Sequence, residues 1–244
     1  MAAKKRKVSS EVAYFYVPDI LATKRLSVEE AEHALRVLRM ELGDEVRVID
    51  GRGHLYRGIL ASKNVQSARL EELTLLEECP PSVAPIHLAI APTKSIDRIE
   101  WLLEKLTELG VDRLSLVITE RAIRRKVNSE RLERIMTSAL KQSQRLWDLK
   151  IELFSSLQEF LESDLLEPQR YIGYCGEEYE RKVLSECFNT GEGSLFLIGP
   201  EGDFTPEEVQ QAVACGFQPV RLTEQRLRTE TAGLYVSMMH LLRQ

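Results

Sequence analysis

The segment Leu195-Phe-Leu-Ile-Gly-Pro-Glu-Gly-Asp-Phe204 contains the pattern that decides the fold. Four apolar residues lead into a glycine-rich bend, and the string Thr205-Pro206-Glu207-Glu208 follows directly. That string is typical of a helix start, because the threonine can cap backbone amides, proline fits the first helical position and a glutamate completes a capping box. The segment therefore predicts a buried strand, a tight bend and a helix.

The same alternation of apolar runs and amphipathic helices continues on both sides of this segment. The predicted strands are 86–91, 114–118, 151–154, 171–174, 195–198 and 219–222. Helices are predicted over 96–109, over 130 to about 144 and from Thr205 to before Gly216. The terminal helix should turn Ala232, Tyr235, Val236, Met239 and Leu242 inward. Such alternation predicts an α/β domain whose mainly parallel sheet is covered on both faces.

The first 75 or so residues have a different pattern, with one helix and several short strands. Ser27-Val-Glu-Glu30 is a capping-box pattern, and Ala31, Leu35 and Leu38 follow at helical spacing. Strands are predicted over 45–50, 55–60 and 69–76, which together indicate a small β-barrel with an inserted helix. Two prolines in Glu77–Ser82 favour a linker after it.

The composition fits a globular protein with an uneven charge distribution. The 244 residues are 43% hydrophobic and 29% charged, which allows one or two domains. The net charge is −5, yet Arg113–Lys150 contains ten basic and four acidic residues, a net charge of +6. A local field acts within about 10 Å, so this segment can attract phosphate despite the acidic remainder. Solvated helical faces are the alternative interpretation.

Cysteine and histidine usage argues against several other classes. The four cysteines are scattered, which predicts reduced thiols in a cytoplasmic protein rather than a disulfide framework or a zinc site. The histidines His33, His54, His87 and His240 are dispersed, and there is no phosphate-binding loop, so neither a metal site nor a histidine-based triad is expected. No stretch approaches the roughly 20 apolar residues that cross a bilayer, so no membrane partner is expected either.

Two bends after predicted strands are the candidates for ligand binding, because ligands of open parallel sheets bind beyond the carboxyl ends of strands. In Gly199–Phe204, glycines allow the backbone to approach a flat ligand, and the following helix has free amides. Thr223–Thr231 ends in Arg228, Thr229, Glu230 and Thr231, which bring charge and hydroxyl groups to a helix start. The alternative for the first bend is an ordinary strand–helix turn. The alternative for Glu230 in the second is a role in capping the helix.

Several short strings, each unspecific alone, occur in a specific order and spacing. They are His33–Arg39, Gly43-Asp44 and Asp50-Gly51, then Lys94, Asp97, Arg98, Glu100, Lys105, Thr107–Gly110, Lys141–Ser143, Ile198–Gly202 and Leu227–Ala232. With these strings the chain resembles, over nearly all of its length after Ala13, the small-subunit (16S) ribosomal RNA uridine-N3 methyltransferases of the SPOUT class.

This resemblance implies the domain organisation, the cofactor and the partners. It implies an α/β, trefoil-knotted SPOUT domain over residues 86–244 that binds S-adenosyl-L-methionine (SAM), and a PUA-like RNA-binding β-barrel over 13–78, with 79–85 as the linker. It also implies a homodimer whose partner is ribosomal RNA or the small ribosomal subunit. Residues 1–12 are expected to be a flexible basic arm, in which Lys4-Lys5-Arg6-Lys7 contacts RNA, serves as a nuclear-import signal or is an artificial remnant.

The resemblance implies roles for individual residues as well. The expected cofactor-binding residues are Leu197, Ile198, Gly199, Pro200, Glu201, Gly202, Leu222, Leu227, Arg228, Thr229 and Thr231. The expected catalytic residues are Arg228 and Glu230. Because uridine N3 carries a proton, Arg228 would stabilise negative charge on the uracil carbonyls, and Glu230 would position that guanidinium or the base.

Six arginines are candidates for contacts with RNA phosphates. They are Arg36, Arg39, Arg121, Arg124, Arg125 and Arg145. Solvated surface arginines are the alternative for each. The aromatic run Tyr14-Phe15-Tyr16 is suited either to stacking on bases or to a strand core.

The sequence departs from the family pattern at three places. Asp203 stands where the family often has glycine, Thr223 lies where a glycine is common, and Lys141–Arg145 differs from the usual string. Two other functions fit the same residues: methylation of another RNA site, and a non-catalytic RNA-binding assembly factor. A nucleotide hydrolase is disfavoured because phosphate-loop and metal-ligand patterns are lacking.

Overall fold

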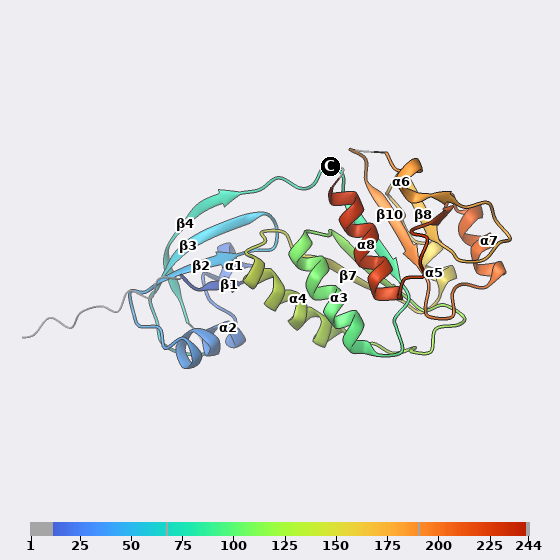
Figure 1. Cartoon of the computed structure of the whole chain (residues 1–244). Coiled ribbons are helices and arrows are strands. Elements are labelled where there is room, and N and C mark those ends of the chain that lie inside the picture. The colour runs from blue at the N-terminus through green and yellow to red at the C-terminus, as the bar shows by residue number, and fades with distance from the viewer. Residues whose placement is uncertain (1–11, 67, 190, 243–244) are drawn as a thin grey trace, which may run out of the picture. The chain divides into compact units, whose positions relative to one another are not determined.

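The computed structural model describes residues 12–66, 68–189 and 191–242, which form two compact units (Figure 1). The first unit extends to Pro81 and also includes Gln144–Trp147, and the second contains Ser82–Ser143 and the chain from Asp148 onward. The predicted basic arm lies outside the described residues except for Val12.

The first unit is built on a four-stranded sheet in the order β1-β2-β3-β4. Its strands are β1 (Tyr14–Tyr16), β2 (Glu45–Ile49), β3 (His54–Leu60) and β4 (Leu70–Glu78). β1 runs parallel to β2, and the other pairs are antiparallel. Phe15 is fully buried in the core with Val46 and Val48, so the strand-core interpretation holds for the centre of the aromatic run.

The helical part of the first unit differs from its prediction at one position. After the short helix α1 (Ile20–Thr23), α2 (Val28–Glu32) begins at the predicted cap Ser27 and continues as the π-helix η1 (His33–Val37). In the π-helix, Leu38 donates its N–H to the carbonyl of His33, 3.0 Å away. This wider turn rotates the later residues around the axis. Leu38, which follows Ala31 and Leu35 at the spacing of one helix face, is therefore exposed, while Ala34 is buried.

The second unit contains a seven-stranded, fully parallel sheet in the order β7-β6-β5-β10-β8-β11-β9. Its strands are β5 (Ile86–Ile90), β6 (Arg113–Val117), β7 (Lys150–Phe154), β8 (Gln169–Gly173), β9 (Lys182–Val183), β10 (Ser194–Ile198) and β11 (Gln218–Arg221). Six of these match the predicted strands, and the two-residue β9 was not predicted. The predicted α/β class is confirmed.

Helices cover both faces of this sheet, as the alternation of strands and helices predicts (Figure 1). One face carries α3 (Ile96–Leu109), α4 (Ser129–Ser143) and α8 (Thr229–Leu241), and the other carries α5 (Leu157–Leu161) and α7 (Pro206–Ala214). Leu195 and Leu197 of β10 pack toward α5 and α7. The remaining helix is the short α6 (Leu184–Cys187).

The terminal helix α8 packs closely on β5 and α3. A Cβ on Gly233 would lie 3.0 Å from Leu88 and 3.1 Å from Ile90, so a glycine here allows the close approach. The buried face of α8 also includes Val236 and His240, whereas Leu242 is 81% exposed. The predicted inward stripe was therefore wrong at Leu242, because α8 is apolar on nearly all sides and its periodicity does not identify one buried face.

Within the described residues, every helix is too short or too polar to span a lipid bilayer.

Candidate active site

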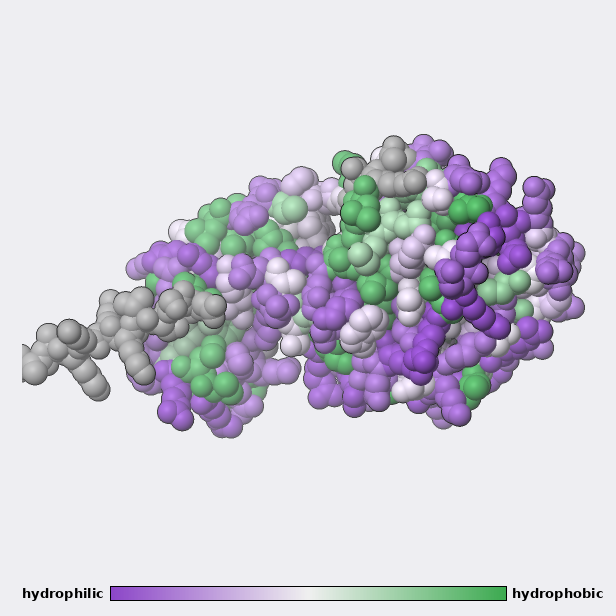
Figure 2. Space-filling view, viewed as in Figure 1, coloured by the Kyte–Doolittle hydropathy of each residue, from purple (hydrophilic) through white to green (hydrophobic). Residues whose placement is uncertain are grey.

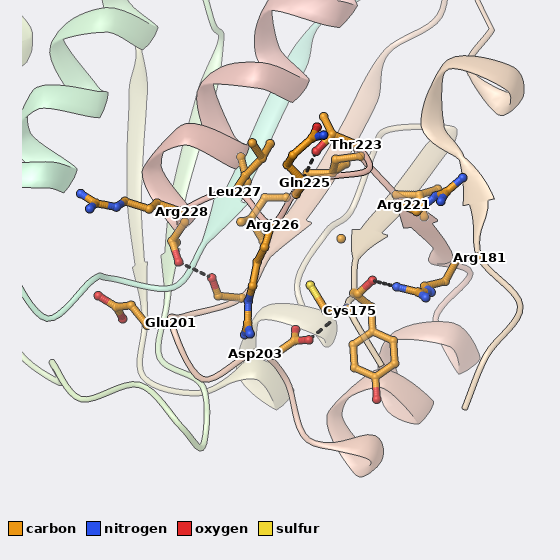
Figure 3. A pocket seen from close by; sticks show the side chains of 18 of the residues that line it. Cys175, Arg181, Glu201, Asp203, Arg221, Thr223, Gln225, Arg226, Leu227 and Arg228 are labelled. Carbon is orange, nitrogen blue, oxygen red and sulfur yellow. Dashed lines mark hydrogen bonds between the residues drawn. The ribbon is translucent and has the colours of Figure 1, made fainter. Parts of the chain in front are cut away.

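A cavity of about 610 Å³ lies at the carboxyl ends of β8, β10 and β11 (Figure 3). Neighbouring parallel strands end at the same edge of a sheet, and β8 lies between β10 and β11, so their three loops meet there. The cavity is lined by 173–175, by Ile198–Glu201 with Asp203, and by 220–229, together with Arg181 and Ala232. Both predicted ligand-binding bends therefore reach one cavity.

The bend after β10 is a tight turn that leads directly into α7. The N–H of Asp203 donates to the carbonyl of Pro200 over 2.9 Å, and Asp203 has a φ of +61°. Thr205 and Glu208 then form the complete capping box that the sequence predicts. The missing Cβ of Gly199 faces the ring of Phe204, which a Cβ would approach to 3.0 Å.

Asp203 connects two loops of the cavity (Figure 3). Its Oδ2 accepts a hydrogen bond of 3.0 Å from the N–H of Cys175 after β8, and its Oδ1 accepts one of 2.9 Å from the N–H of Phe204. The carboxylate thus fixes the β8 loop to the β10 bend. Asp203 is a position where the sequence departs from the family pattern, and here the larger side chain has a structural role.

The start of α8 is held against the β10 bend by Thr229, whose hydroxyl donates to the carbonyl of Gly199 over 3.1 Å. Arg228 is the N-cap residue of α8 and is exposed. Its guanidinium makes no hydrogen bond or ion pair within the described residues. Figure 3 shows the side chains of Arg228 and Glu201 on the same side of the cavity, opposite Arg181.

Glu230 lies in the first turn of α8 and is only 8% exposed. Its Oε1 lies 3.6 Å from the guanidinium of Arg98, in the first turn of α3. Its buried Oε2 has no hydrogen-bond partner. Glu230 does not line the large cavity, and it pairs with Arg98 rather than with Arg228, whose guanidinium it was expected to position.

Cys175 and Tyr174, which follow β8 at the cavity, are uncharged at pH 7. Burial raises the pKa of the Cys175 thiol, and the negative charge of Asp203 adds to the effect. A hydrogen bond to Glu178, together with burial, raises the pKa of Tyr174 to about 12. Neither group is therefore an activated nucleophile or a base.

Eight of the eleven predicted cofactor-binding residues line the cavity. The other three do not: Leu197 is fully buried in the core, Gly202 lies against the side chain of Arg121, and Thr231 is exposed on α8. The prediction did not include the wall formed by 173–175 and Arg181. The apolar run 171–174 was the available signal for this wall, because it predicts a strand whose carboxyl end lies at an edge of the sheet. The sequence did not show which strands lie next to it, so the wall could not be placed.

Three of the six arginines proposed for RNA make contacts inside the second unit. Arg121 donates to the carbonyls of Gly202 and Phe204 at 3.0 and 3.1 Å, and Arg124 donates to the carbonyl of Lys94 at 3.0 Å. Arg125 donates to the carbonyl of Glu120. These three arginines brace the loop after β6 while remaining at least partly exposed.

The other three arginines belong to the first unit. Arg36 pairs with Glu32 at 2.9 Å, and both side chains are largely exposed. Arg39 is exposed and has a φ of +55°. Arg145 is partly buried within Gln144–Trp147. Contact of any of the six with RNA remains a prediction.

A second, smaller cavity of about 460 Å³ lies at the start of α3. It is lined by Lys94, Ser95, Ile96, Asp97, Arg98, Arg124 and Glu201. Glu201 lines both cavities. The two cavities are therefore neighbours that share one carboxylate.

A buried Ser–His–Glu arrangement lies away from both cavities. Nε2 of His87 is 2.8 Å from the hydroxyl of Ser115, and Nδ1 of His87 is 3.1 Å from the carboxylate of Glu167. All three residues are buried, and His87 and Ser115 lie within β5 and β6. No substrate has access there, so the arrangement is part of the core. Among the described residues, there is no group of three potential metal ligands.

Comparison with protein families supplies the class. A family model described as an RNA methyltransferase domain matches residues 80–240, and one described as an RNA methyltransferase PUA domain matches residues 26–73. The chain belongs to the RNA methyltransferase family, and its first unit contains the PUA-like domain that the sequence resemblance implies.

Individual relatives agree with this assignment. Ribosomal RNA small subunit methyltransferase E of Synechocystis is 32% identical over 87% of this chain and 71% of the relative. A probable rRNA methyltransferase from Porphyromonas gingivalis is 41% identical, with a TM-score of 0.86 over 95% of this chain and 98% of its own. Ribosomal RNA small subunit methyltransferase E of Neisseria gonorrhoeae, solved bound to S-adenosyl methionine, is 30% identical, with a TM-score of 0.77 over 94% and 96% of the two chains.

Proposed function

We propose that this protein methylates N3 of a specific uridine in small-subunit (16S) ribosomal RNA, with SAM as the methyl donor. The observation that carries the proposal is the cavity at the ends of β8, β10 and β11 in a chain of the RNA methyltransferase family. A solved relative that is 30% identical over nearly the whole chain is bound to S-adenosyl methionine.

The residues that line this cavity suit SAM. Its volume of about 610 Å³ is in the range of about 300–1,000 Å³ that is usual for pockets holding ligands of this size. Ile198, Leu222 and Leu227 offer apolar contacts for an adenine ring, and the bends offer backbone groups. The carboxylates of Glu201 and Asp203 complement a positively charged donor. When bound, SAM supplies an electrophilic methyl group on a cationic sulfur.

The chain's own residues must then bind and orient the uracil and stabilise its charge. Methylation at N3 requires loss of the N3 proton, which leaves negative charge on the uracil carbonyls. Arg228 lies at the edge of the cavity with an unpaired guanidinium, so it is suited to stabilise that charge. Glu230 is suited to orient Arg98 from its buried position.

We assign RNA recognition to the first unit together with the basic segment of the second. Residues 13–78 are proposed as the RNA-binding domain, 79–85 as the linker and 86–244 as the catalytic domain; the two family matches support this division. Ribosomal RNA or the small subunit is the proposed partner, and the cytoplasm is the proposed location, since that is where this substrate is found in bacteria.

We also propose that the protein is a homodimer that uses the outer face of α8. Figure 2 shows hydrophobic side chains gathered over α8. Met238 and Leu242 are 44% and 81% exposed, and Trp101 on the neighbouring helix α3 is 44% exposed. A helix that is apolar on nearly all sides usually has both faces covered, so a second copy is the expected partner.

The experiment that tests the function is mass spectrometry of nucleosides from 16S rRNA of a strain with and without the gene. The proposal predicts that N3-methyluridine at one position disappears in the deletion strain and returns with the gene. Loss of a different modified nucleoside would favour methylation of another RNA site. Unchanged nucleosides, together with no heat of SAM binding in calorimetry, would favour a non-catalytic assembly factor.

A further inference from the structure

The second cavity, beside the large one, has features of a nucleotide-binding subsite. Three cationic side chains line it, those of Lys94, Arg98 and Arg124. Arg124 is held in place by hydrogen bonds of 3.3 and 3.0 Å from Nε and one Nη to the carbonyl of Lys94. A fixed guanidinium at a cavity wall is suited to phosphate or to carbonyl oxygens of a base, because its donors lie in one plane.

A buried carboxylate that pairs with one of these cations also favours a polar ligand. Glu230 pairs with Arg98, its side chain is only 10% exposed, and its Oε2 has no hydrogen-bond partner. A buried carboxylate oxygen without a partner is costly unless another group uses it. A ligand that accepts hydrogen bonds from Arg98 would connect the Arg98–Glu230 pair to a larger polar network. The start of α3 adds backbone amides, since its N-cap Ser95 makes no side-chain capping bond.

Glu201 is the wall residue that the two cavities share. Its Oε1 accepts a hydrogen bond of 3.0 Å from the N–H of Lys94, which fixes the carboxylate between the cavities. Its Oε2 has no partner among the described residues and remains available as an acceptor. Arg228 lies on the same side of the large cavity as Glu201 (Figure 3).

We infer that the second cavity receives the acceptor uridine nucleotide and that Glu201 accepts its N3 proton. This inference rests on the proposed function, because it requires the methyl donor in the large cavity. Glu201 then stands between donor and acceptor. The cations of the second cavity bind the nucleotide's phosphate and, together with Arg228 at the edge of the large cavity, its uracil carbonyls, which makes the N3–H more acidic.

The step balances without a further reactant. The N3–H proton passes to Oε2 of Glu201, and the electron pair left on N3 forms the new N–C bond with the methyl carbon. The C–S bond breaks, and its electrons stay on sulfur, which changes from a sulfonium cation to a neutral thioether. Glu201 is exposed, so it releases the proton to water afterwards.

The test compares Glu201→Gln with Glu207→Gln in the full chain. Glu207 is an exposed glutamate of α7 that lines neither cavity, so it is the matched control. Calorimetry gives SAM affinity, and methylation of 16S rRNA is measured between pH 6 and 9. We expect Glu201→Gln to bind SAM like the wild type and to methylate about a hundredfold more slowly or worse at neutral pH. Its deficit should shrink as pH rises, because uridine itself then ionises.

A binding measurement without cofactor supplies an independent readout. The cofactor-free wild type should bind uridine monophosphate more tightly than N3-methyluridine monophosphate, and Glu201→Ala should abolish this preference. A wild-type rate for Glu201→Gln, a loss of its SAM binding, or an unchanged preference in Glu201→Ala would overturn the inference. Failure of the proposed function would be recognised separately, since the wild-type protein would then not bind SAM or not methylate uridine N3.

Discussion

Arg228 illustrates how one residue's surroundings define its expected role. It caps no helix amide with its side chain, it lines the cavity, and its guanidinium has no partner within the described residues. An exposed arginine without a hydrogen-bond or ion-pair partner is available to a substrate.

Replacing Arg228 by alanine should reduce turnover about a hundredfold, because a preorganised donor to developing negative charge contributes roughly 3 kcal/mol. SAM affinity should change little, since Ile198, Leu222 and Leu227 and the other residues of the cavity wall remain in the variant. Single-turnover methylation and calorimetry measure the two effects. Arg228→Lys should recover only part of the rate, because a lysine lacks the planar fork. Unchanged turnover in Arg228→Ala would show that the role assigned to this residue is wrong.

His87 should make the stability of the protein depend on pH. Burial lowers the pKa of His87, against the opposing hydrogen bond to Glu167. Below an unfolded-state pKa of about 6.5, the unfolded chain therefore binds a proton that the folded chain does not, and stability falls as the pH falls. Urea unfolding at pH 7.5 and 5.5 should show that the free energy of unfolding falls less between these pH values for His87→Asn than for the wild type.

The free energy of unfolding of His87→Asn should still fall somewhat as the pH is lowered, because burial also lowers the pKa of His240. An equal loss in both proteins would contradict the assignment to His87.

At the scale of elements, the segment Gln144–Trp147 between α4 and β7 returns to the first unit. The indole N–H of Trp147 donates to the carbonyl of Cys79 over 2.9 Å, and the N–H of Gly53 donates to the carbonyl of Leu146 over 3.0 Å. Gly53 has a φ of +95° and no room for a Cβ, which would meet the Cys79 carbonyl and lie 2.8 Å from the indole.

Gly53→Ala should destabilise the first unit by about 3 kcal/mol, because it adds a steric clash to an unfavourable backbone conformation. Gly43→Ala is the matched control: its φ of +87° is similar, but a Cβ there meets nothing within 4 Å. The free energy of unfolding of Gly43→Ala should fall by only about 1 kcal/mol. Denaturant unfolding of both variants measures the difference, and equal losses would rule out a packing role for Gly53.

The sequence predicted those elements whose signals are local. The helix predicted over 96–109 has the same bounds in the structure and ends at Gly110, whose φ is +88°. The capping box at Thr205 is complete. The π-helix at His33–Val37 could not be predicted from residue spacing, because it departs from the 3.6-residue repeat. The buried face of α8 could not be predicted either, because this helix is apolar on most sides.

For the site, the two bends were predictable because glycines and capping residues mark them. The wall formed by Tyr174, Cys175 and Arg181 was not, because it depends on β8 pairing between β10 and β11, contacts between residues far apart in the sequence. The return of Gln144–Trp147 to the first unit was missed for the same reason.

At the scale of the whole molecule, the homodimer is the feature most open to a direct test. Met238→Glu places a charge on the outer face of α8, where Met238 is 44% exposed. We expect the wild type to be a dimer in analytical ultracentrifugation and Met238→Glu to shift toward monomer while keeping its circular dichroism spectrum, because burying an unpaired charge is costly. Leu166→Glu, at an apolar residue 79% exposed and outside α8, should remain dimeric.

A dimer of unchanged affinity in Met238→Glu would mean that another surface forms the interface. The trefoil knot stays a prediction from the family resemblance.

We expect the cavity between Ile198–Glu201 and the start of α8 to hold the methyl donor. A crystal structure with S-adenosylhomocysteine, the demethylated form of SAM, tests it most directly. We expect electron density for the compound in this cavity, with its sulfur atom on the side where Glu201 and Arg228 lie. The compound bound elsewhere, or a cavity filled by the chain's own side chains at saturating concentration, would contradict it.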